Sequence, residues 1–442
     1  MRVLIDGSHL MVPRGTGVAT YARGLARGLR QAGGRVDILY GRSWSGGDDP
    51  LLREVEFYDA AAQTLSRSPL ARLRSAAGLA RMFSTLRPQE VPRGEVVVDG
   101  WEPDVALADR QWNRANLFRL GQARQRLTGG YVTVSNAGIA ADLAHWAYPL
   151  PLRLAGVPNV VTVHDLVPLR LPYATLDRKK SYLKLVRWVA ETADLIVTVS
   201  EASKRDIVEL LGVDPARVVV TYQPVELPRV VPTDAGVEQT VGRLGLKPGG
   251  YVLAYGAAEP KKNLGRLIEA YLEADPGVPL VLAGPRGWLW KRELAWLRGR
   301  PKRRWGRRVV RRLPYVSRRE LDALIRGARG VAFASLYEGF GLPIVESFAR
   351  NTPVLTSDRG ATAEIAGGPE GGAVLVDPYD VASIAAGLTR LVADDDERAE
   401  RVRRGRDRLE VFSDAACRAR LLAGYRRLGV EPPTADGETR SS

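Results

Sequence analysis

Short runs of Val, Leu and Ile recur along the chain, and most precede a longer stretch in which apolar positions return every three or four residues. The first pattern is typical of strands buried on both faces, and the second of amphipathic helices. Their alternation predicts parallel sheets built from strand–helix–strand units. In the first half of the chain, strands are expected at Val3–Ile5, Val36–Tyr40, Glu95–Val98, Tyr131–Val134, Val160–Val163, Leu195–Val199 and Val218–Thr221.

A second series of strands and helices begins after a segment rich in Pro and Gly. Residues Tyr222–Gly250 have the composition of an irregular linker. Beyond it, strands are expected at Tyr251–Tyr255, Leu280–Ala283, Val309–Leu313, Val331–Ala334, Val354–Thr356 and Ala373–Val376. Helices are expected at Leu264–Ala274, near Leu289–Leu297 and at Ser317–Ala328, matching one over Thr20–Gln31 in the first series.

Two series of this kind predict an α/β fold with two Rossmann-like, doubly wound parallel-sheet domains that face each other across a cleft. A chain of 442 residues has room for two cores, and open sheets of this type bind ligands at the carboxyl ends of their strands. The predicted domains are residues 1–225 and 226–412. Residues 413–430 are expected to form a C-terminal helix that packs back toward the first domain, and 431–442 a disordered polar tail.

Composition narrows the class of protein. The single cysteine, Cys417, excludes an internal disulfide. The N-terminus is predicted to be a strand rather than a signal peptide, and no apolar run approaches the ~18 residues of a membrane span. We therefore expect a cytoplasmic protein, with peripheral contact at the inner face of the membrane left open. No clustered His, Cys and Asp residues indicate a metal site.

The net charge of +15 is concentrated in one segment. Residues 286–312 contain twelve Arg or Lys and one acid, Glu293, with Trp288, Trp290, Trp296 and Trp305 among them. Such a segment is able to bind an anionic membrane or a nucleic acid. No nucleic-acid partner is expected, because no groove-reading or RNA-binding motif accompanies the cations. A membrane contact and a plain solvated face remain the alternatives.

A glycine loop between a strand and a helix gives the clearest chemical signal. In Glu338-Gly-Phe-Gly-Leu-Pro-Ile-Val-Glu346, Gly339 and Gly341 permit a sharp turn and a close ligand approach, and Pro343 suits the first helical position. The amides of residues 340–342 then lie at a helix N-terminus, which suits a phosphate. Glu338 and Glu346 are spaced to reach opposite parts of one phosphorylated ligand. The simpler alternative is a turn with two solvated acids.

Three other segments add candidate residues. The turn Gly256–Asn263 brings Lys261 and Lys262 to the same edge, where a cation would stabilise a diphosphate leaving group. His164 directly follows a predicted strand and has Asp165 beside it. Gly15 and Gly17 lie in the loop after the first strand. Each of these features alone also fits a structural role.

Taken together, these segments resemble the retaining glycosyltransferases of family four, which have the two-domain GT-B fold. The resemblance covers nearly the whole chain. It rests on Glu338–Glu346, Glu259-Pro-Lys-Lys-Asn-Leu264, Gly372-Ala-Val-Leu-Val-Asp-Pro-Tyr-Asp380, His164-Asp165 and Thr198-Val-Ser-Glu201.

The resemblance implies a role for each candidate. The catalytic residues would be His164 at the donor sugar, Glu338 beside it, and Lys262 at the phosphates. The donor-binding residues would be Gly15, Gly17, Lys262, Val316, Gly339, Phe340, Gly341, Leu342 and Glu346, with Val316 at the base and Glu346 at the ribose. One departure stands out: many members have an arginine where this chain has Ala257.

The function implied is transfer of a mannosyl, glucosyl or related sugar, with retention and without a metal. The partners would be a nucleotide-diphosphate sugar, acting as co-substrate rather than cofactor, and a hydroxyl acceptor that is a glycan, a lipid-linked molecule or a small metabolite. Two alternatives remain open. One is a nonhydrolysing sugar-nucleotide epimerase, and the other is a non-catalytic protein that binds nucleic acid or membrane through residues 286–312.

Overall fold

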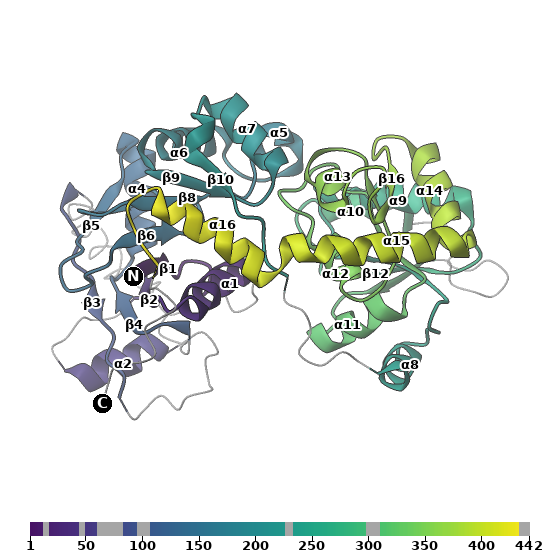
Figure 1. The fold of residues 1–442 in the computed structure, drawn as a ribbon, viewed down its shortest axis with the longest axis horizontal. Helices are drawn as coiled ribbons and strands as arrows, with labels where there is room; N and C mark the ends of the chain where they lie inside the picture. Colours follow the sequence, from purple (N-terminus) through teal and green to yellow (C-terminus); the bar gives the residue numbers. More distant parts are fainter. Residues whose placement is uncertain are drawn as a thin grey trace.

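Two parallel sheets, each packed between helices, make up the described part of the chain (Figure 1). The computed structural model describes residues 1–11, 17–43, 49–59, 83–94, 107–225, 233–297 and 310–432. The prediction of two parallel-sheet domains is confirmed. The expected strand Glu95–Val98 and all but two residues of the expected tail lie outside the described residues.

The first sheet has the strand order β10-β9-β8-β6-β1-β2-β4-β3, and among its described pairs β3–β4 alone is antiparallel. Its strands are β1 Arg2–Asp6, β2 Arg35–Tyr40, β3 Gln89–Glu90, β4 Arg110–Asn113, β6 Leu143–Trp146, β8 Asn159–Thr162, β9 Leu195–Thr198 and β10 Val218–Val220. A separate parallel pair joins β5 Val132–Val134 to β7 Leu152–Leu154. The strand expected at Tyr131–Val134 therefore lies outside the main sheet, and β4 and β6 were not predicted.

Helices cover both faces of this sheet. They are α1 Gly17–Gln31, α2 Pro50–Tyr58, α4 Leu117–Thr128, α5 Val167–Arg170, α6 Lys179–Thr192 and α7 Glu201–Leu211. Successive side chains of β1 point to opposite faces of the sheet. Val3 and Ile5 therefore pack in the same core as α1, and Leu4 packs in the core that contains α4, α6 and α7. Ser200 caps α7 as predicted, because its hydroxyl accepts the amide of Ser203.

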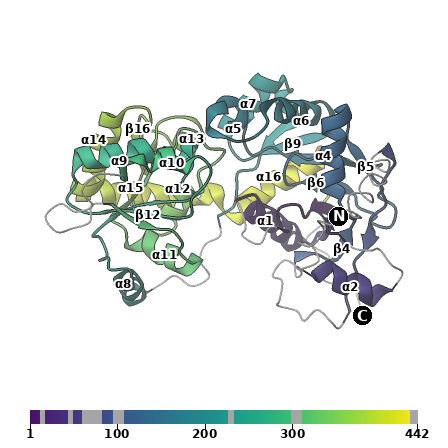
Figure 2. The same cartoon turned by 180° about the vertical axis from the view of Figure 1, so that it is seen from behind.

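The second sheet is parallel throughout its described strands, in the order β13-β12-β11-β14-β15-β16. Its strands are β11 Val252–Tyr255, β12 Leu280–Ala283, β13 Val310–Leu313, β14 Gly330–Phe333, β15 Val354–Ser357 and β16 Ala373–Val376. Its helices are α8 Asp234–Arg243, α9 Leu264–Ala274, α10 Trp290–Glu293, α11 Arg318–Gly327, α12 Leu342–Phe348, α13 Gly360–Ala366, α14 Val381–Ala393 and α15 Asp395–Arg408. Helices α9, α10 and α14 gather on one face, as Figure 2 shows, and α11 and α12 pack on the other.

Two local predictions for this half are wrong. The linker was expected to be irregular, but it contains α8, which Thr233 caps and which buries Val237 and Val241, four residues apart. The helix expected near Leu289–Leu297 is instead the short α10 followed by a 3₁₀ turn at Ala295–Leu297. Leu289 precedes α10 with a φ of +55°, which ends any continuous helix there.

The chain crosses between the two halves after β10 and again between α15 and α16. The second crossing is a 3₁₀ turn at Leu409–Phe412, after which α16 Asp414–Arg426 lies against α1 and β10. Figure 1 shows α15 and α16 end to end along both halves. The Tyr425 hydroxyl of α16 is buried and hydrogen-bonds His145 Nδ1 of β6, 2.5 Å away. Within the described residues, no helix combines the length and apolar character that a membrane span requires.

Candidate active site

The donor loop, defined here as residues 338–342, joins β14 to α12 at the edge that faces the first domain. Gly341 has a φ of +107°, a conformation that favours glycine, and it forms the N-cap of α12. Pro343 occupies the second helical position rather than the predicted first. A Cβ atom on Gly339 would lie 2.6 Å from the carbonyl oxygen of His164. Glycine at this position therefore permits the two domains to approach one another.

Glu346 lies one turn inside α12 and is held by two partners. Its carboxylate accepts a hydrogen bond from the Tyr255 hydroxyl at 2.8 Å and another from Arg318 Nη1 at 2.7 Å. Tyr255 ends β11 and Arg318 begins α11, so three different elements fix one carboxylate. Burial and the neighbouring Glu346 raise the pKa of Tyr255 well above its ordinary value, so it remains a hydrogen-bond donor.

Glu338 and Lys262 form a direct ion pair. Lys262 Nζ lies 2.7 Å from Glu338 Oε1, and Lys261 Nζ lies 3.4 Å from Oε2. Burial alone would raise the pKa of Glu338, but the two ammonium groups and the hydrogen bond from Lys262 outweigh it and lower the pKa to about 2. The Lys262 ammonium also lies 4.7 Å from the centre of the Phe333 ring. The carboxylate is therefore ionised at neutral pH.

The pKa of Glu338 predicts an acid-dependent contribution to stability. Because its folded pKa of about 2 lies below the ordinary 4.5, its contribution is complete above pH 4.5 and is lost as the pH falls toward 2. Glu338→Gln should therefore reduce the free energy of unfolding at pH 7 and weaken its dependence on pH between 5 and 3. Urea unfolding at several pH values measures both. Parallel pH profiles for the two proteins would contradict the assignment.

His164 lies just beyond β8, and the first domain fixes the orientation of its ring. Its Nε2 lies 3.0 Å from the Ala147 carbonyl oxygen, and because a carbonyl only accepts, Nε2 carries the proton. Asp6 accepts the Ala147 amide at 2.6 Å, and the Tyr21 ring meets the His164 ring edge-on at 4.7 Å. Burial lowers the pKa of His164 below its ordinary value. The neutral ring therefore has Nδ1 as an acceptor.

Interdomain contacts bring the donor loop and the His164 segment together. Ser200 Oγ donates to the Gly339 carbonyl at 2.7 Å. Ser203 Oγ lies 3.0 Å from the His164 carbonyl of its own domain and 3.3 Å from the Gly339 carbonyl of the other. In addition, the Glu364 carboxylate of α13 accepts the amides of Glu201 and Ala202, both at 2.8 Å. An acid of the second domain thus caps the N-terminus of α7 in the first.

Three predicted residues remain: Gly15, Gly17 and Val316. Gly15 lies outside the described residues, and Gly17 is the first residue of α1. Val316 lies between β13 and α11, partly buried against the hydrophobic core. Within the described residues, no hydrogen bond or ion pair joins Gly17 or Val316 to His164 or Lys262, so the roles predicted for all three residues remain predictions.

A pocket of about 310 Å³, including its open mouth, lies beside Lys262 at the ends of β11, β12 and β13. Ala257 and Arg312 also line it, and the lining contains no carboxylate. The Arg312 guanidinium has no hydrogen bond or ion pair with another described residue, and burial and the nearby Arg286 lower its pKa. Because the side chain of Ala257 is small, it leaves part of the pocket open, and Arg312 lines this pocket as a second cation beside Lys262.

The described tryptophans of the basic segment 286–312 contact the protein itself. Trp288 Nε1 donates to the Ala174 carbonyl of the first domain at 2.6 Å. Trp290 and Trp296 pack against the core beneath α9, and Arg286 lies 4.1 Å from the Trp290 ring. Trp305 lies outside the described residues. Within the described ranges, no group of three His, Cys, Asp or Glu residues is close enough to hold a metal ion.

Sequence reasoning missed several residues that hold the candidates in place: Asp6, Tyr255, Arg318, Ser203 and Glu364. Asp6 and Tyr255 each end a strand at the ligand-binding edge of its sheet, and this position was a usable signal. Arg318 and Glu364 gave no such signal, since their partners lie 28 and 163 residues away.

The sequence of this chain is similar to the sequences of known glycosyltransferases. Residues 15–229 match the family described as Glycosyltransferase Family 4, and residues 243–408 match Glycosyl transferases group 1. The O-antigen chain mannosyltransferase B of Escherichia coli is 31% identical over 63% of this chain and 72% of its own. The MMP alpha-(1->4)-mannosyltransferase of Mycolicibacterium hassiacum is 26% identical over 93% of this chain and 94% of its own.

Solved structures of other proteins are similar to this chain over nearly its whole length. Anabaena HepE, crystallised with UDP and glucose, superposes with a TM-score of 0.65 at 15% identity, covering 97% of this chain and 100% of its own. The sucrose-phosphate synthase of Thermosynechococcus elongatus also gives 0.65, at 17% identity, covering 97% and 99%. At such low sequence identities, the superposition is evidence for the fold alone. The family matches are the evidence for the class of activity. The chain therefore belongs to the glycosyltransferases of group 1 and family 4, and its two parallel-sheet domains form a GT-B fold.

Proposed function

We propose that this glycosyltransferase moves a hexosyl group from a nucleotide-diphosphate sugar to an acceptor hydroxyl, with retention and without a metal. The observation that carries the proposal is the arrangement around α12. Glu346 is fixed by Tyr255 and Arg318 on one side of the donor loop, and Lys262 pairs with Glu338 on the other. Relatives support the donor class, since HepE was crystallised with UDP-glucose.

The donor's diphosphate would lie between the amides of Phe340–Leu342 and the ammonium of Lys262. Both would stabilise negative charge as the bond between the anomeric carbon and the phosphate oxygen breaks. Arg312, in the pocket beside Lys262, is the next cation that an anion in this space would meet. Glu346 would accept hydrogen bonds from the ribose hydroxyls, and Val316 would meet the base.

His164 would orient a hydroxyl group by accepting its hydrogen bond at Nδ1. The new bond from the acceptor oxygen would form on the face from which the diphosphate departs, and the acceptor's proton would pass to the leaving phosphate. Glu338 would lie beside the sugar, where its charge favours an oxocarbenium-like transition state. Closure of the two domains would exclude water, which otherwise hydrolyses the donor.

The names of the relatives indicate which sugar is transferred more clearly than which acceptor receives it. Two of them are named as mannosyltransferases and several others as D-inositol 3-phosphate glycosyltransferases. A mannosyl or glucosyl donor is therefore the first choice for this chain. The acceptor would be a glycan, a small metabolite or a lipid-linked molecule, and the last of these would bring the protein to the inner face of a membrane.

A thermal-shift screen of UDP-, GDP-, ADP- and dTDP-sugars tests the proposal, because a bound donor stabilises the folded state. One donor class should raise the melting temperature, and turnover with it should survive EDTA and give a product with the donor's anomeric configuration by NMR. An epimerised donor in the absence of acceptor would favour an epimerase. Salt-sensitive nucleic-acid binding that survives Glu346→Ala would favour the non-catalytic alternative.

A further inference from the structure

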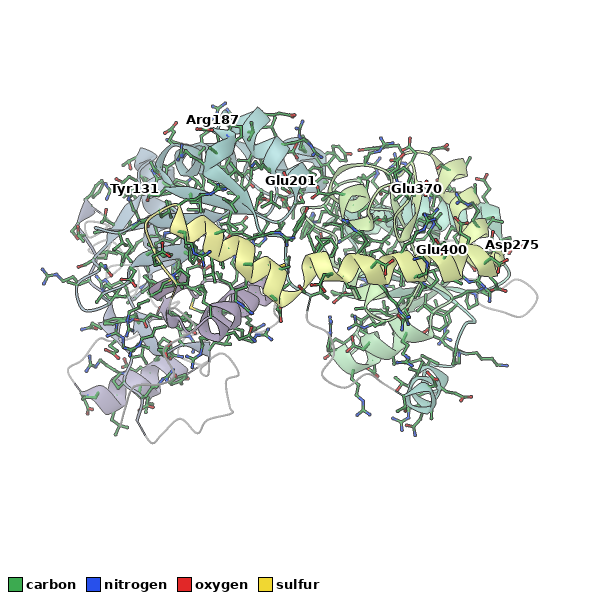
Figure 3. The ribbon with its side chains drawn as sticks, in the orientation of Figure 1. Tyr131, Arg187, Glu201, Asp275, Glu370 and Glu400 are labelled. Atoms are coloured by element: carbon green, nitrogen blue, oxygen red, sulfur yellow. The ribbon has the colours of Figure 1, made fainter. Side chains whose placement is uncertain are left out.

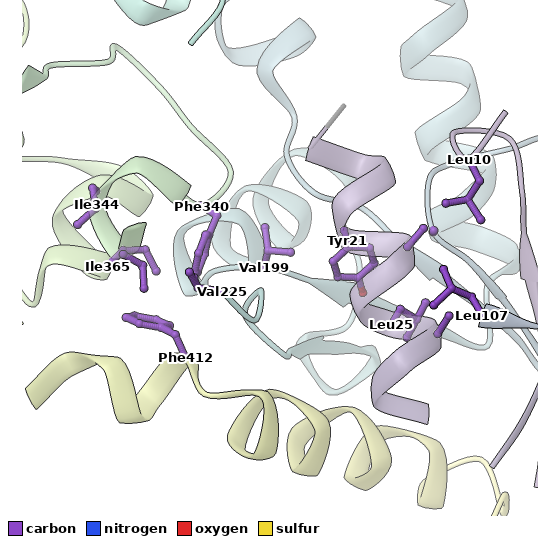
Figure 4. Packing of buried hydrophobic residues seen from close by; sticks show 14 of the residues in the cluster. Leu10, Tyr21, Leu25, Leu107, Val199, Val225, Phe340, Ile344, Ile365 and Phe412 are labelled. Atoms are coloured by element: carbon purple, nitrogen blue, oxygen red, sulfur yellow. The ribbon is translucent and has the colours of Figure 1, made fainter. Parts of the chain in front are cut away.

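Three aromatic rings meet where the donor loop touches both crossings between the domains, and Figure 4 shows two of them, Phe340 and Phe412. Phe340 belongs to the donor loop, Tyr222 to the first crossing and Phe412 to the second. The Phe340 and Phe412 rings are edge-on with centroids 5.5 Å apart, and Tyr222 lies 5.3 Å from Phe412 and 6.4 Å from Phe340. Phe340 and Phe412 are 4% and 1% exposed, so neither ring has free space in which to move.

Tyr222 is held in an unusual conformation by contacts on both sides. Its φ is +58°, which is costly for a residue with a bulky side chain. Burial and the nearby Glu364 carboxylate, the one that caps α7, raise the pKa of its hydroxyl to about 12, and the Arg420 guanidinium of α16 lies 5.0 Å from its ring. The first crossing therefore lies close to Glu364 of the second domain and to Arg420 of the C-terminal helix.

The donor loop is thus fixed from two directions. On one side, Ser200 of the first domain holds the Gly339 carbonyl. On the other side, the next residue, Phe340, packs between Tyr222 and Phe412. A rotation of one domain about its crossings would move these two rings against Phe340 and pull Gly339 from Ser200. The position of the loop and the orientation of the domains cannot change independently.

We propose that Tyr222, Phe340 and Phe412 are positioning residues that couple the donor loop to the angle between the domains, so that nucleotide affinity depends on ring packing at the crossings. The coupling rests on the proposed function in one respect, namely that a nucleoside diphosphate binds the donor loop. Phe340 then acts through its ring as well as through its backbone amide, whereas Tyr222 and Phe412 act through Phe340.

Distances between spin labels on the two domains measure the coupling directly. Cys417 is the single cysteine of the chain, so a Cys417→Ser background leaves Arg187→Cys and Glu370→Cys as the labelled positions. Both side chains lie on the outside of the molecule, one on each domain (Figure 3). Pulsed electron paramagnetic resonance gives the distance distribution with and without nucleotide, and calorimetry gives the Kd of UDP, GDP, ADP and dTDP.

Phe412→Leu is the main variant, because it removes the ring but keeps an apolar side chain. We expect a broader distance distribution without nucleotide and about a tenfold higher Kd for the nucleoside diphosphate that binds the parent protein. Phe57→Leu is the matched control. Phe57 is also 1% exposed and has two edge-on partners, Tyr40 at 5.2 Å and Tyr58 at 5.0 Å, but it lies in the first domain away from both crossings.

The proposal is overturned if Phe412→Leu lowers the melting temperature as Phe57→Leu does but leaves the distance distribution unchanged. If Phe412→Leu does not fold, Tyr222→Leu replaces it, since this variant removes the ring that packs against Phe412 and keeps an apolar side chain. The same changes are then expected on a smaller scale, and their absence overturns the proposal equally. A parent protein that binds none of UDP, GDP, ADP and dTDP would contradict the proposed function, while the nucleotide-free distances would still decide the coupling.

Discussion

Lys262→Ala is expected to lower kcat by about a hundredfold to a thousandfold while the protein remains folded. Lys262 is the nearest cation to Glu338 and lines the pocket next to the donor loop. In the reaction, its ammonium would neutralise charge that develops on the departing diphosphate, so its loss should affect the transition state more than the bound donor. Folding should survive because Lys261 stays beside Glu338.

Steady-state kinetics with the donor found by thermal shift would measure this effect. Lys262→Arg, which keeps the charge, should recover part of the lost kcat. Lys247→Ala is a suitable control, since Lys247 is an exposed lysine of the same domain, before β11. An unchanged kcat in Lys262→Ala would remove this lysine from the mechanism, whereas a rise in KM alone would assign it to donor binding.

Glu346→Ala is expected to abolish the rise in melting temperature that the donor causes. Hydrogen bonds to a charged group contribute roughly 1.5–3 kcal/mol each, so losing even one or two weakens binding by on the order of a hundredfold. A ligand present at one hundred times its Kd stabilises the fold by about 2.7 kcal/mol, but at a concentration equal to its Kd by only about 0.4 kcal/mol. The donor-induced shift should therefore almost disappear.

A ligand lacking the ribose hydroxyls makes this test specific. The parent protein should bind UDP or GDP more tightly than the corresponding 2′,3′-dideoxynucleotide, whereas Glu346→Ala should bind both equally weakly. Glu273→Gln, which removes an exposed carboxylate from α9, should behave like the parent protein. If Glu346→Ala still distinguishes the two nucleotides, the ribose hydroxyls bind elsewhere.

The strands of the second domain were predictable to within a residue or two, and those of the first domain less so. Strands such as Leu280–Ala283 and Ala373–Val376 are apolar throughout because they are buried on both faces. Strands β4 and β6 contain Gln111, Asn113 and His145, which are buried only because distant residues satisfy them. His145, for example, bonds Thr162 and Tyr425. Such pairing is set by tertiary structure, which no local pattern of hydrophobic residues reveals.

In the candidate site, too, contiguous motifs were predictable from the sequence and contacts between distant segments were not. The acids, glycines and lysines of the donor loop and the Lys262 turn were found because each motif is contiguous in the sequence. The contacts that orient them join distant segments: Tyr255 and Glu346 are 91 residues apart, and Ser200 and Gly339 are 139 residues apart. Sequence alone placed Lys262 and Glu338 at the same edge, but it did not predict that they form an ion pair.

Helix α16 imposes an order on how the chain acquires its structure during synthesis. The ribosome releases the first sheet long before it makes Tyr425, whose hydroxyl pairs with His145 across 280 residues. Until then, the strands around β6 lack a helix that they need, and a nascent chain ending near residue 225 would expose apolar surface. The strands of the second sheet, β11 to β16, and the helices around them, α8 to α15, follow one another in the sequence. This half therefore has all of its elements once α15 has been made. The half synthesised first is therefore the half completed last.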